Sequence, residues 1–386
     1  MFEILKTIKG DKVIWMVVIL LSTLSLLAVY SSTGTLAYRY QEGNTEYYML
    51  KHFIILLLGL GLMYLAHLIK YTYYSRLFQI ALYIAIPLLI LTLLFGSNIN
   101  EARRALPLPF NLSFQTADLA KLTLIMYLAR SLTKRQEYIK SFKSAFLPVM
   151  LPVIIVCGLI IPSDFSTAAM LFVTSLVLMF IGRINIWHIA GLVGICIFLL
   201  AAFILVLSLL PPEYQGRLST WKNRIESFTN PEETENYQIE QSKIAIASGG
   251  LLGKGPGNST QRNFLPHPYS DFIFAIIIEE YGIVGGGVVV LLYLILFFRA
   301  VRIVIKFPKN FGVFLTIGVS FSLVFQGLIN MGVAVNLLPV TGQPLPLVSM
   351  GGTSIWFTSL AIGIILSVSK EVQEGTVETQ HGYLTA

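Results

Sequence analysis

The chain has 386 residues, of which 55% are hydrophobic and only 12% are charged, and its net charge is +7. Soluble domains carry about 25% charged residues, so this composition excludes a soluble globular protein and indicates an integral membrane protein. The apolar runs are about 20 residues long, which lets a helix cross the roughly 30 Å hydrocarbon core. Because the runs lack strict alternation, a β-barrel is excluded as well.

The apolar runs predict an all-α polytopic membrane protein with ten transmembrane helices. The first run follows three lysines but is too long for a signal peptide, so it is predicted to be an uncleaved span. Residues 1–372 are predicted to form a single transmembrane domain, followed by a polar, disordered tail at residues 373–386. The ten predicted spans are residues 13–31, 52–70, 77–96, 117–133, 146–162, 165–182, 187–210, 272–298, 311–334 and 353–370.

The distribution of Lys and Arg predicts the orientation. With a cytoplasmic N-terminus, the basic residues of the short connections fall mainly on the inner side. Both termini are then cytoplasmic, and one large loop, at about residues 211–271 between spans seven and eight, lies outside. This loop breaks the bias with six basic residues. Either an anionic ligand or the usual exemption of long loops from the charge rule accounts for them.

The outer loop contains two recognisable segments. Residues 237–247 have helical spacing of apolar residues, which predicts an amphipathic helix lying on the membrane surface. Residues 249–259 are rich in glycine, which permits positive φ and close backbone approach to a ligand. Their spacing is not that of a P-loop, so a flexible loop is favoured over a phosphate cradle.

Asp271 stands where the eighth apolar run begins. As a helix N-cap, Ser270 or Asp271 would contribute roughly 1 kcal/mol of stability. As a general base at the outer surface, Asp271 would need a partly apolar pocket that raises its pKa, whereas a cap position lowers the pKa of a carboxylate. The residues alone leave both interpretations open.

Other charged residues fall in or beside the apolar runs, where charge is costly and usually has a partner or a function. Lys121 forms either a cationic cluster for a phosphate group with Arg103 and Arg104, or a buried ion pair with Asp118, Glu279 or Glu280. Asp164, between spans five and six, is predicted to be a helix cap. The scattered His residues and two Cys residues show no metal-ligand spacing.

The segment from Asn330 to Ser354 contains a hairpin rich in Pro and Gly. Irregular backbone at membrane depth is tolerated where it lines a cavity. The hairpin and the large outer loop are therefore predicted to build an outer vestibule together.

Four segments together resemble one known family, and the likeness covers nearly the whole chain. The segments that carry the resemblance are residues 100–121, 241–255, 265–280 and 344–354. The family is SEDS (shape, elongation, division and sporulation). The glycine-rich part of the loop, GPGNSTQ at residues 255–261, is closer to the FtsW branch of this family than to its RodA branch.

This resemblance implies a peptidoglycan glycosyltransferase that polymerises lipid II, a disaccharide–pentapeptide on undecaprenyl pyrophosphate, during cell division. An acceptor sugar hydroxyl attacks the anomeric carbon of the donor while the lipid pyrophosphate leaves. The family's general base corresponds to Asp271. Cationic side chains are expected to balance the charge of the leaving group. The sequence leaves open whether a divalent cation, Mg²⁺ or Mn²⁺, shares this task.

Two further sets of residues are assigned with the resemblance in view. Glu279, Glu280, Asn330, Gly351 and Gly352 are assigned structural roles around the cavity. The proposed contacts to substrate or pyrophosphate are Arg103, Arg104, Lys121, Arg217, Lys243, Arg262, Ser349 and Thr353.

The resemblance also implies partners and a location. The expected partners are lipid II, membrane lipids, a class B penicillin-binding protein with transpeptidase activity, and other divisome proteins; nucleic acid is not expected. The expected location is the bacterial inner membrane, at the division septum. The alternatives are a lipid II flippase, a RodA-type elongation polymerase and a non-catalytic scaffold.

Overall fold

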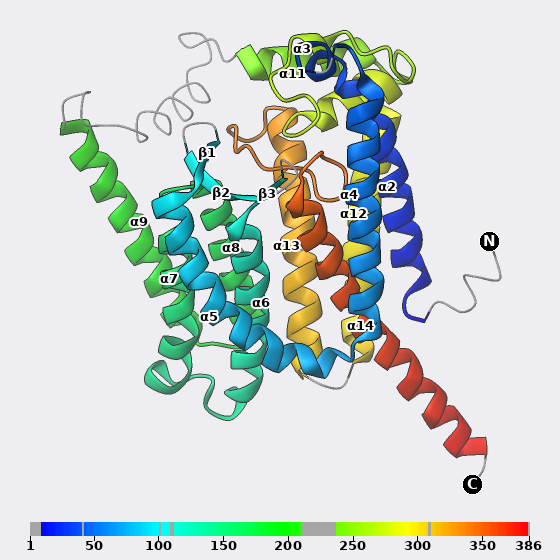
Figure 1. Cartoon of the computed structure of the whole chain (residues 1–386). Coiled ribbons are helices and arrows are strands. Elements are labelled where there is room, and N and C mark those ends of the chain that lie inside the picture. The colour runs from blue at the N-terminus through cyan, green and yellow to red at the C-terminus, as the bar shows by residue number, and fades with distance from the viewer. Residues whose placement is uncertain are drawn as a thin grey trace.

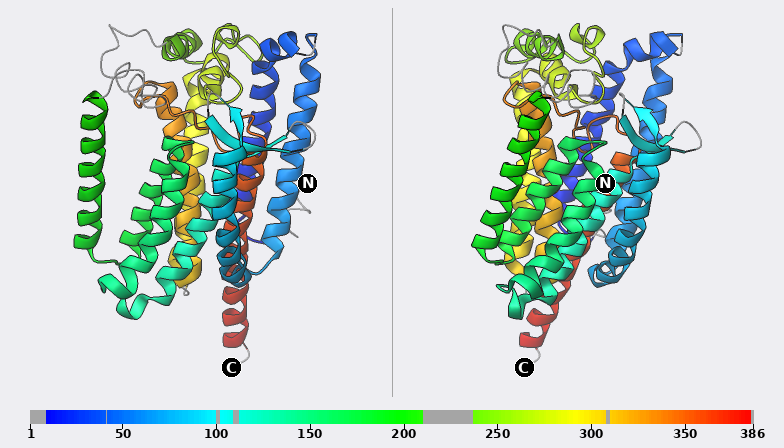
Figure 2. Two further views of the ribbon diagram at one scale, coloured as in Figure 1. Left: turned by 60° about the vertical axis from the view of Figure 1, so that its left-hand side comes forward. Right: turned by 90° about the vertical axis from the view of Figure 1, so that its left-hand side faces the viewer.

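The computed structural model describes residues 9–40, 42–99, 102–108, 112–209, 237–307 and 310–384. The described chain is a bundle of long helices that stand side by side, capped at one end by short helices, loops and a small sheet (Figures 1 and 2). The long helices are α2 (Lys12–Ser32), α4 (Thr45–Leu68), α5 (Tyr71–Phe95), α6 (Thr116–Lys134), α7 (Leu147–Ile160), α8 (Phe165–Ile181), α9 (Ile186–Leu209), α12 (Ile273–Lys306), α13 (Asn310–Ala334) and α14 (Thr353–Leu384).

These helices account for the positions of the ten predicted spans, and the polytopic helical membrane fold is confirmed. Three of the predicted spans coincide with α6, α8 and α9, which are not among the seven helices that meet the length and composition criteria for crossing a membrane. A total of ten spans therefore stays a prediction. By length and composition, seven described helices can cross a membrane: Lys12–Ser32, Thr45–Leu68, Tyr71–Phe95, Phe142–Ile160, Ile273–Lys306, Asn310–Ala334 and Thr353–Glu374.

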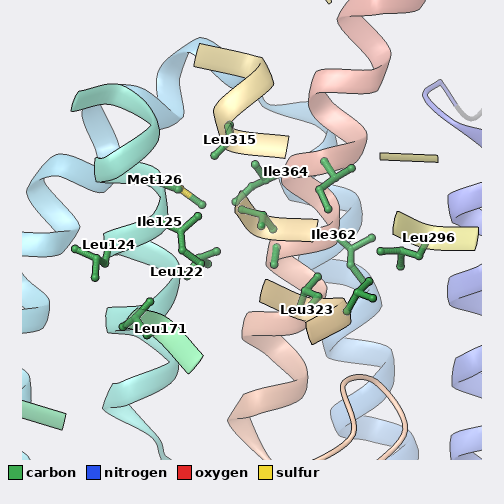
Figure 3. Close-up of a cluster of buried hydrophobic side chains, with 14 of the residues drawn as sticks. Leu122, Leu124, Ile125, Met126, Leu171, Leu296, Leu315, Leu323, Ile362 and Ile364 are labelled. Atoms are coloured by element: carbon green, nitrogen blue, oxygen red, sulfur yellow. The ribbon is translucent and has the colours of Figure 1, made fainter. Parts of the chain in front are cut away.

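The core lies where α6, α13 and α14 meet, and α8 and α12 pack around it. Figure 3 shows side chains from these helices turned toward one another, among them Leu122 and Ile125 of α6, Leu323 of α13 and Ile362 of α14. The helix α6 is buried along most of its length because it is enclosed by its neighbours. This central position explains how α6 keeps charged side chains that a lipid-facing helix could not carry.

Both ends of the described chain lie at the same end of the bundle (Figure 1). Asp11 caps α2 by accepting hydrogen bonds from the N–H groups of Val13 and Ile14, and it also pairs with Arg299 at 2.6 Å. Gly10 and Gln373 exchange two hydrogen bonds of 3.0 Å each. These contacts hold the start of α2 against α12 and α14.

The structure differs from the sequence-based prediction at the C-terminal end of α14. The segment expected to be a disordered tail continues the helix to Leu384. Gln373 bonds to Gly10, and Glu374 pairs with Lys9 at 2.9 Å. These two contacts, with partners distant in sequence, hold the first residues of this segment.

The opposite end of the bundle carries a small sheet and a short helix that sequence patterns missed. A three-stranded antiparallel sheet, ordered β1-β2-β3, precedes α6, and the short helix α3 (Gly34–Tyr40) follows α2. The other short elements are η1 (Gln136–Tyr138) and η2 (Phe142–Phe146), which connect α6 to α7, η4 (Gln261–Asn263), and α11 (Tyr237–Gly249), which confirms the helix predicted at residues 237–247. The strands are β1 (Ser97–Ile99), β2 (Ala102–Leu108) and β3 (Leu112–Phe114). β1 and β3 have three residues each, too few for an alternating pattern to be seen, and β2 reads ARRALPL, without strict alternation of apolar and polar residues.

The helix α12 contains a sharp bend that the sequence analysis did not predict. Gly282 has φ 71° and ψ −176°, a conformation outside the helical region. A Cβ atom placed on Gly286 would lie 2.7 Å from Cγ1 of Ile278 and 3.5 Å from Cζ of Phe274. In a straight helix these residues would be about 12 and 18 Å apart along the axis. The first segment, residues 273–281, therefore folds back against the second, residues 283–306.

The glycine-rich loop after α11 supplies the hydrogen bonds that the bend removes. The N–H groups of Lys254 and Gly255 each donate to α12 carbonyls, those of Glu279 and Glu280, at 2.9 Å. In return, the N–H of Ile283 donates to the carbonyl of Gly250 at 2.9 Å. The glycines thus serve close backbone packing, and the phosphate-cradle alternative gains no support from this geometry.

We predict that Gly282→Ala strongly destabilises the protein, whereas Gly287→Ala does not. A side chain at position 282 would be forced into a nearly glycine-only conformation, at a cost of about 1–3 kcal/mol, and its Cβ would also clash with the backbone of Leu251 and Gly253. Gly287 has open space around it, and alanine favours a helix over glycine. Thermal unfolding in detergent measures both; equal midpoints would refute the role of the bend.

Candidate active site around Asp271

Asp271 lies where the outer loop and the Pro/Gly hairpin meet, as the sequence predicted for the vestibule. The N–H of Met350 donates to the carbonyl of Tyr269 at 2.9 Å. The hydroxyl of Ser349 donates to the carbonyl of Ser270 at 2.6 Å and accepts from the N–H of Leu345 at 2.8 Å. The two residues before Asp271 are therefore held by the hairpin.

The hairpin itself is anchored within the helix bundle. Gln326 of α13 donates to the carbonyl of Pro344 at 2.9 Å, and the Tyr293 hydroxyl of α12 donates to the carbonyl of Pro346. Ser25 of α2 donates to the carbonyl of Val348 at 2.7 Å. Since Gln326, Tyr293 and Ser25 lie well inside their helices, the hairpin enters the bundle, and Asp271 is recessed with it.

A chain of buried polar groups connects Asp271 to a second aspartate. Asn330 donates through Nδ2 to the carbonyls of Asp271, at 2.9 Å, and Gln343, at 2.7 Å. Gln343 donates through Nε2 to Asp164 at 3.2 Å and to the hydroxyl of Thr167 at 2.8 Å. Asp164 also caps α8, as the sequence predicted, by accepting from the Thr167 N–H at 3.0 Å.

The carboxyl group of Asp271 is oriented by the neighbouring serine. Ser270 donates its hydroxyl to Oδ1 at 2.9 Å, and the missing side chain of Gly342 leaves space beside Oδ2. Burial raises the pKa of Asp271, while the Ser270 hydrogen bond and the charges of His267 and Arg104 lower the pKa in part, and Asp164 raises it. The net effect is a carboxylate that is more basic than an exposed aspartate.

The N-cap alternative for Asp271 is wrong. Phe272 occupies the cap position of α12, and no side chain makes a capping hydrogen bond there. The carboxyl group instead accepts from the neighbouring serine side chain. A carboxylate that does not serve the helix end avoids the associated lowering of its pKa.

The structure brings only part of the predicted cationic set close to Asp271. Arg104 donates to the carbonyl of Ser163 at 3.1 Å, lies 3.9 Å from Asp164, and acts electrostatically on Asp271. Arg262 instead bonds to the Ser31 carbonyl at 3.0 Å, and Lys243 is exposed on α11. Arg217 and the side chain of Arg103 lie outside the described residues.

Lys121 has partners within the bundle. Its ammonium group lies 3.1 Å from Asp118 and donates to Gln326 at 2.8 Å. Of the two alternatives for Lys121, this geometry favours the buried ion pair, with Asp118 as the partner. A cavity of about 20 Å³ adjoins Asp118 and Lys121, which is large enough for about one water molecule. Gln326 links this pair to the hairpin through Pro344.

Glu279 and Glu280 lie at the bend of α12 and hold the glycine-rich loop. Glu279 is fully buried and accepts from Lys254 at 2.6 Å and from the N–H and hydroxyl of Thr260 at 3.1 and 2.9 Å. Glu280 accepts from the hydroxyl of Ser31. Neither pairs with Lys121, so the predicted ion pair of Lys121 with Glu279 or Glu280 is wrong. The reason is that the back-folding of α12 turns both carboxylates toward the loop.

Two hydroxyl groups proposed as substrate contacts have protein partners. Ser349 bonds within the hairpin and to Ser270, as described above. Thr353 donates to the carbonyl of Ser113 at 2.9 Å and accepts from the N–H of Gln115 at 3.2 Å. Gly351 and Gly352 form the step into α14, where Gly352 has φ 50°. These contacts position the loops, and direct contact of either hydroxyl with substrate stays a prediction.

A small apolar cluster adjoins Asp271 in the chain. Phe272 and Ile276 pack with Ile239 of α11, Leu265 and Val333. Among the described residues, no group of three or more His, Cys, Asp and Glu side chains is placed to hold a metal ion. The side chains of this part of the chain therefore do not form a metal centre by themselves.

Comparison with known proteins identifies the family. The model of the FtsW/RodA/SpoVE cell cycle protein family matches residues 11–374. A probable peptidoglycan glycosyltransferase FtsW from Coxiella burnetii is 34% identical over 93% of this chain and 96% of its own length. Stage V sporulation protein E from Bacillus subtilis is 32% identical over 95% and 98%. The chain belongs to the FtsW/RodA/SpoVE family.

Solved structures agree with this assignment. A chain of a peptidoglycan synthase complex, described as coordinating polymerization and crosslinking, matches with a TM-score of 0.74 at 25% identity, covering 94% of this chain and 98% of that one. The rod shape determining protein RodA from Thermus thermophilus matches with a TM-score of 0.68 at 25% identity, covering 95% and 98%. The resemblance to the SEDS family is thus confirmed.

We predict that Ser349→Ala lowers thermal stability, because it leaves the Ser270 carbonyl and the Leu345 N–H without this partner. An unsatisfied buried polar group costs about 1–3 kcal/mol. Ser320→Ala is the control, since that buried hydroxyl bonds at 3.2 Å to the Ile317 carbonyl within its own helix. Unfolding midpoints of the two variants in detergent provide the measurement. Matching midpoints would contradict the bridging role of Ser349.

Proposed function

We propose that this chain is a peptidoglycan glycosyltransferase that polymerises lipid II, with Asp271 as the general base. Membership of the family and relatives described as probable peptidoglycan glycosyltransferases support the activity. The observation that supports the base is the half-buried carboxylate of Asp271, oriented by Ser270 and recessed where two loops meet. FtsW relatives at this identity favour the division role over the elongation role.

The environment of Asp271 suits proton transfer from a sugar hydroxyl. The acceptor hydroxyl loses its proton to the carboxylate as its oxygen attacks the anomeric carbon, and the bond from that carbon to the lipid pyrophosphate breaks. Burial raises the pKa of Asp271, which brings the base closer to the working pH. The polar network through Asn330 and Ser349 fixes the backbone on both sides of the carboxylate.

Charge on the departing pyrophosphate needs a cation. Arg104 is the predicted cation best placed for this role, because it adjoins Asp164 and its charge reaches Asp271. Preorganised positive charge at the position where negative charge develops lowers the barrier. Mg²⁺ or Mn²⁺ is not assigned a step, because the described side chains provide no cluster to hold it.

The partner and location follow from the same family. The structural likeness to a synthase complex that coordinates polymerization and crosslinking supports a class B penicillin-binding protein as the partner. The multi-pass helical fold supports the bacterial inner membrane, and the FtsW relatives support the division septum. With both described ends of the chain in the cytoplasm, Asp271 would face the outer side.

We predict that Asp271→Asn abolishes glycan polymerisation from lipid II while the protein still folds. Loss of a general base costs about 10²–10⁴-fold in rate, and asparagine preserves shape without accepting the proton. Glu240→Gln on exposed α11 is the matched control and is expected to retain the rate. Glycan length on gels, made by purified protein in nanodiscs, provides the measurement. Normal chain growth by Asp271→Asn would remove the mechanism.

The pH dependence gives a second prediction. The base must be ionised, so kcat/KM rises as pH increases through the raised pKa of Asp271. Ser270→Ala removes a hydrogen bond that lowers this pKa, and the acidic limb of the profile therefore moves to higher pH. Ser270→Thr keeps the hydroxyl and serves as the control. An acidic limb that stays in place in Ser270→Ala would exclude Asp271 as the titrating base.

A further inference from the structure

The turn that follows α11 exposes two leucines at the bend of α12. Leu251 is 71% exposed and Leu252 is 82% exposed. The carbonyls of Gly250 and Leu251 accept hydrogen bonds from Ile283 and Val284, the first residues after the bend. The leucines therefore share the level of Ile283 and Val284, which are themselves 55% and 56% exposed.

The length of the uncharged run after the bend places this level near one boundary of the hydrocarbon core. After the bend, residues 283–298 carry no charge, and they are bounded by Glu280 on one side and Arg299 on the other. These 16 residues span about 24 Å as a helix, most of the roughly 30 Å apolar core. Their exposed side chains, including Val288, Leu291 and Phe298, form the lipid-facing surface of α12. Leu251 and Leu252 extend this surface at its outer end.

The backbone of the turn is suited to lipid contact. Polar backbone groups in an apolar medium must be paired. The carbonyls of Gly249, Gly250 and Leu251 accept from Gly253, Ile283 and Val284, and the N–H groups of Lys254 and Gly255 donate to α12 carbonyls. The close packing of Gly253 and Gly282 permits these bonds, so the leucine side chains can enter the membrane while these backbone groups stay paired.

We propose that Leu251 and Leu252 insert into the outer leaflet and anchor the glycine-rich loop to lipid acyl chains. The anchor acts next to the bend that directs residues 273–281, and hence Asp271, back into the bundle. Lys254, which follows the turn and is partly exposed, pairs with Glu279 and keeps the rest of the loop at the interface. This inference concerns the loop and the membrane, and it does not depend on the chemistry of Asp271.

The test measures the environment of the turn directly. Leu252→Cys, in a background with Cys157→Ala and Cys196→Ala, is labelled with an environment-sensitive NBD fluorophore. The full chain is placed in nanodiscs of phosphatidylethanolamine and phosphatidylglycerol. Val288→Cys, on the lipid-facing surface of α12, is the lipid reference, and Glu240→Cys, on exposed α11, is the water reference. Lipids with a quencher on the acyl chain report the depth of each label.

The expected result is that the label at position 252 has blue-shifted emission and is quenched by acyl-chain quenchers nearly as strongly as the label at position 288. Emission and quenching equal to those at position 240 would overturn the proposal. Emission that shifts only when a single-span partner protein is added would also overturn it, since the leucines would then form a protein contact. Labelled Leu251→Cys repeats the test at the second position.

Discussion

The arrangement of the site depends on a break in one membrane helix and on the loop that satisfies the broken hydrogen bonds. At Gly282 the backbone leaves the helical region, and carbonyl and N–H groups of α12 lose their intrahelical partners. The backbone of residues 250–255 provides replacements, and the buried carboxylate of Glu279 holds the same loop through Lys254 and Thr260. Without such partners, freed polar groups at this depth would cost several kcal/mol each.

The bend has a direct chemical consequence for Asp271. A straight α12 would carry its first residues away from the bundle, where a carboxylate is well hydrated. Because residues 273–281 fold back, Asp271 is instead brought against the hairpin, where Ser349 and Asn330 hold its neighbours. Burial in this position raises the pKa of the carboxyl group, and the cost is moderated by one serine hydroxyl and nearby positive charge. The same fold therefore provides both position and basicity.

The position of Asp271 between the loop and the hairpin could be predicted from the sequence, but some of its neighbours could not. Asp271 was identified because it is a lone carboxylate at a span boundary, and the meeting of the loop with the hairpin was predicted correctly. The capping alternative failed because Phe272 takes the cap position. Asp164 was predicted as a cap, yet it also contacts Arg104 and Gln343. Those contacts join segments that no local pattern connects, and Gln343 carried no signal of its own.

Composition and hydropathy by themselves determined the membrane class, the positions of the long helices and the large polar loop, because each depends on the free energy of placing side chains in lipid. Motif spacing determined the family. Tertiary structure alone decided the bend at Gly282, the partners of Glu279 and Lys121, and the small sheet before α6. These features arise from hydrogen bonds and ion pairs between residues far apart in the chain, which a pattern read along the sequence does not contain.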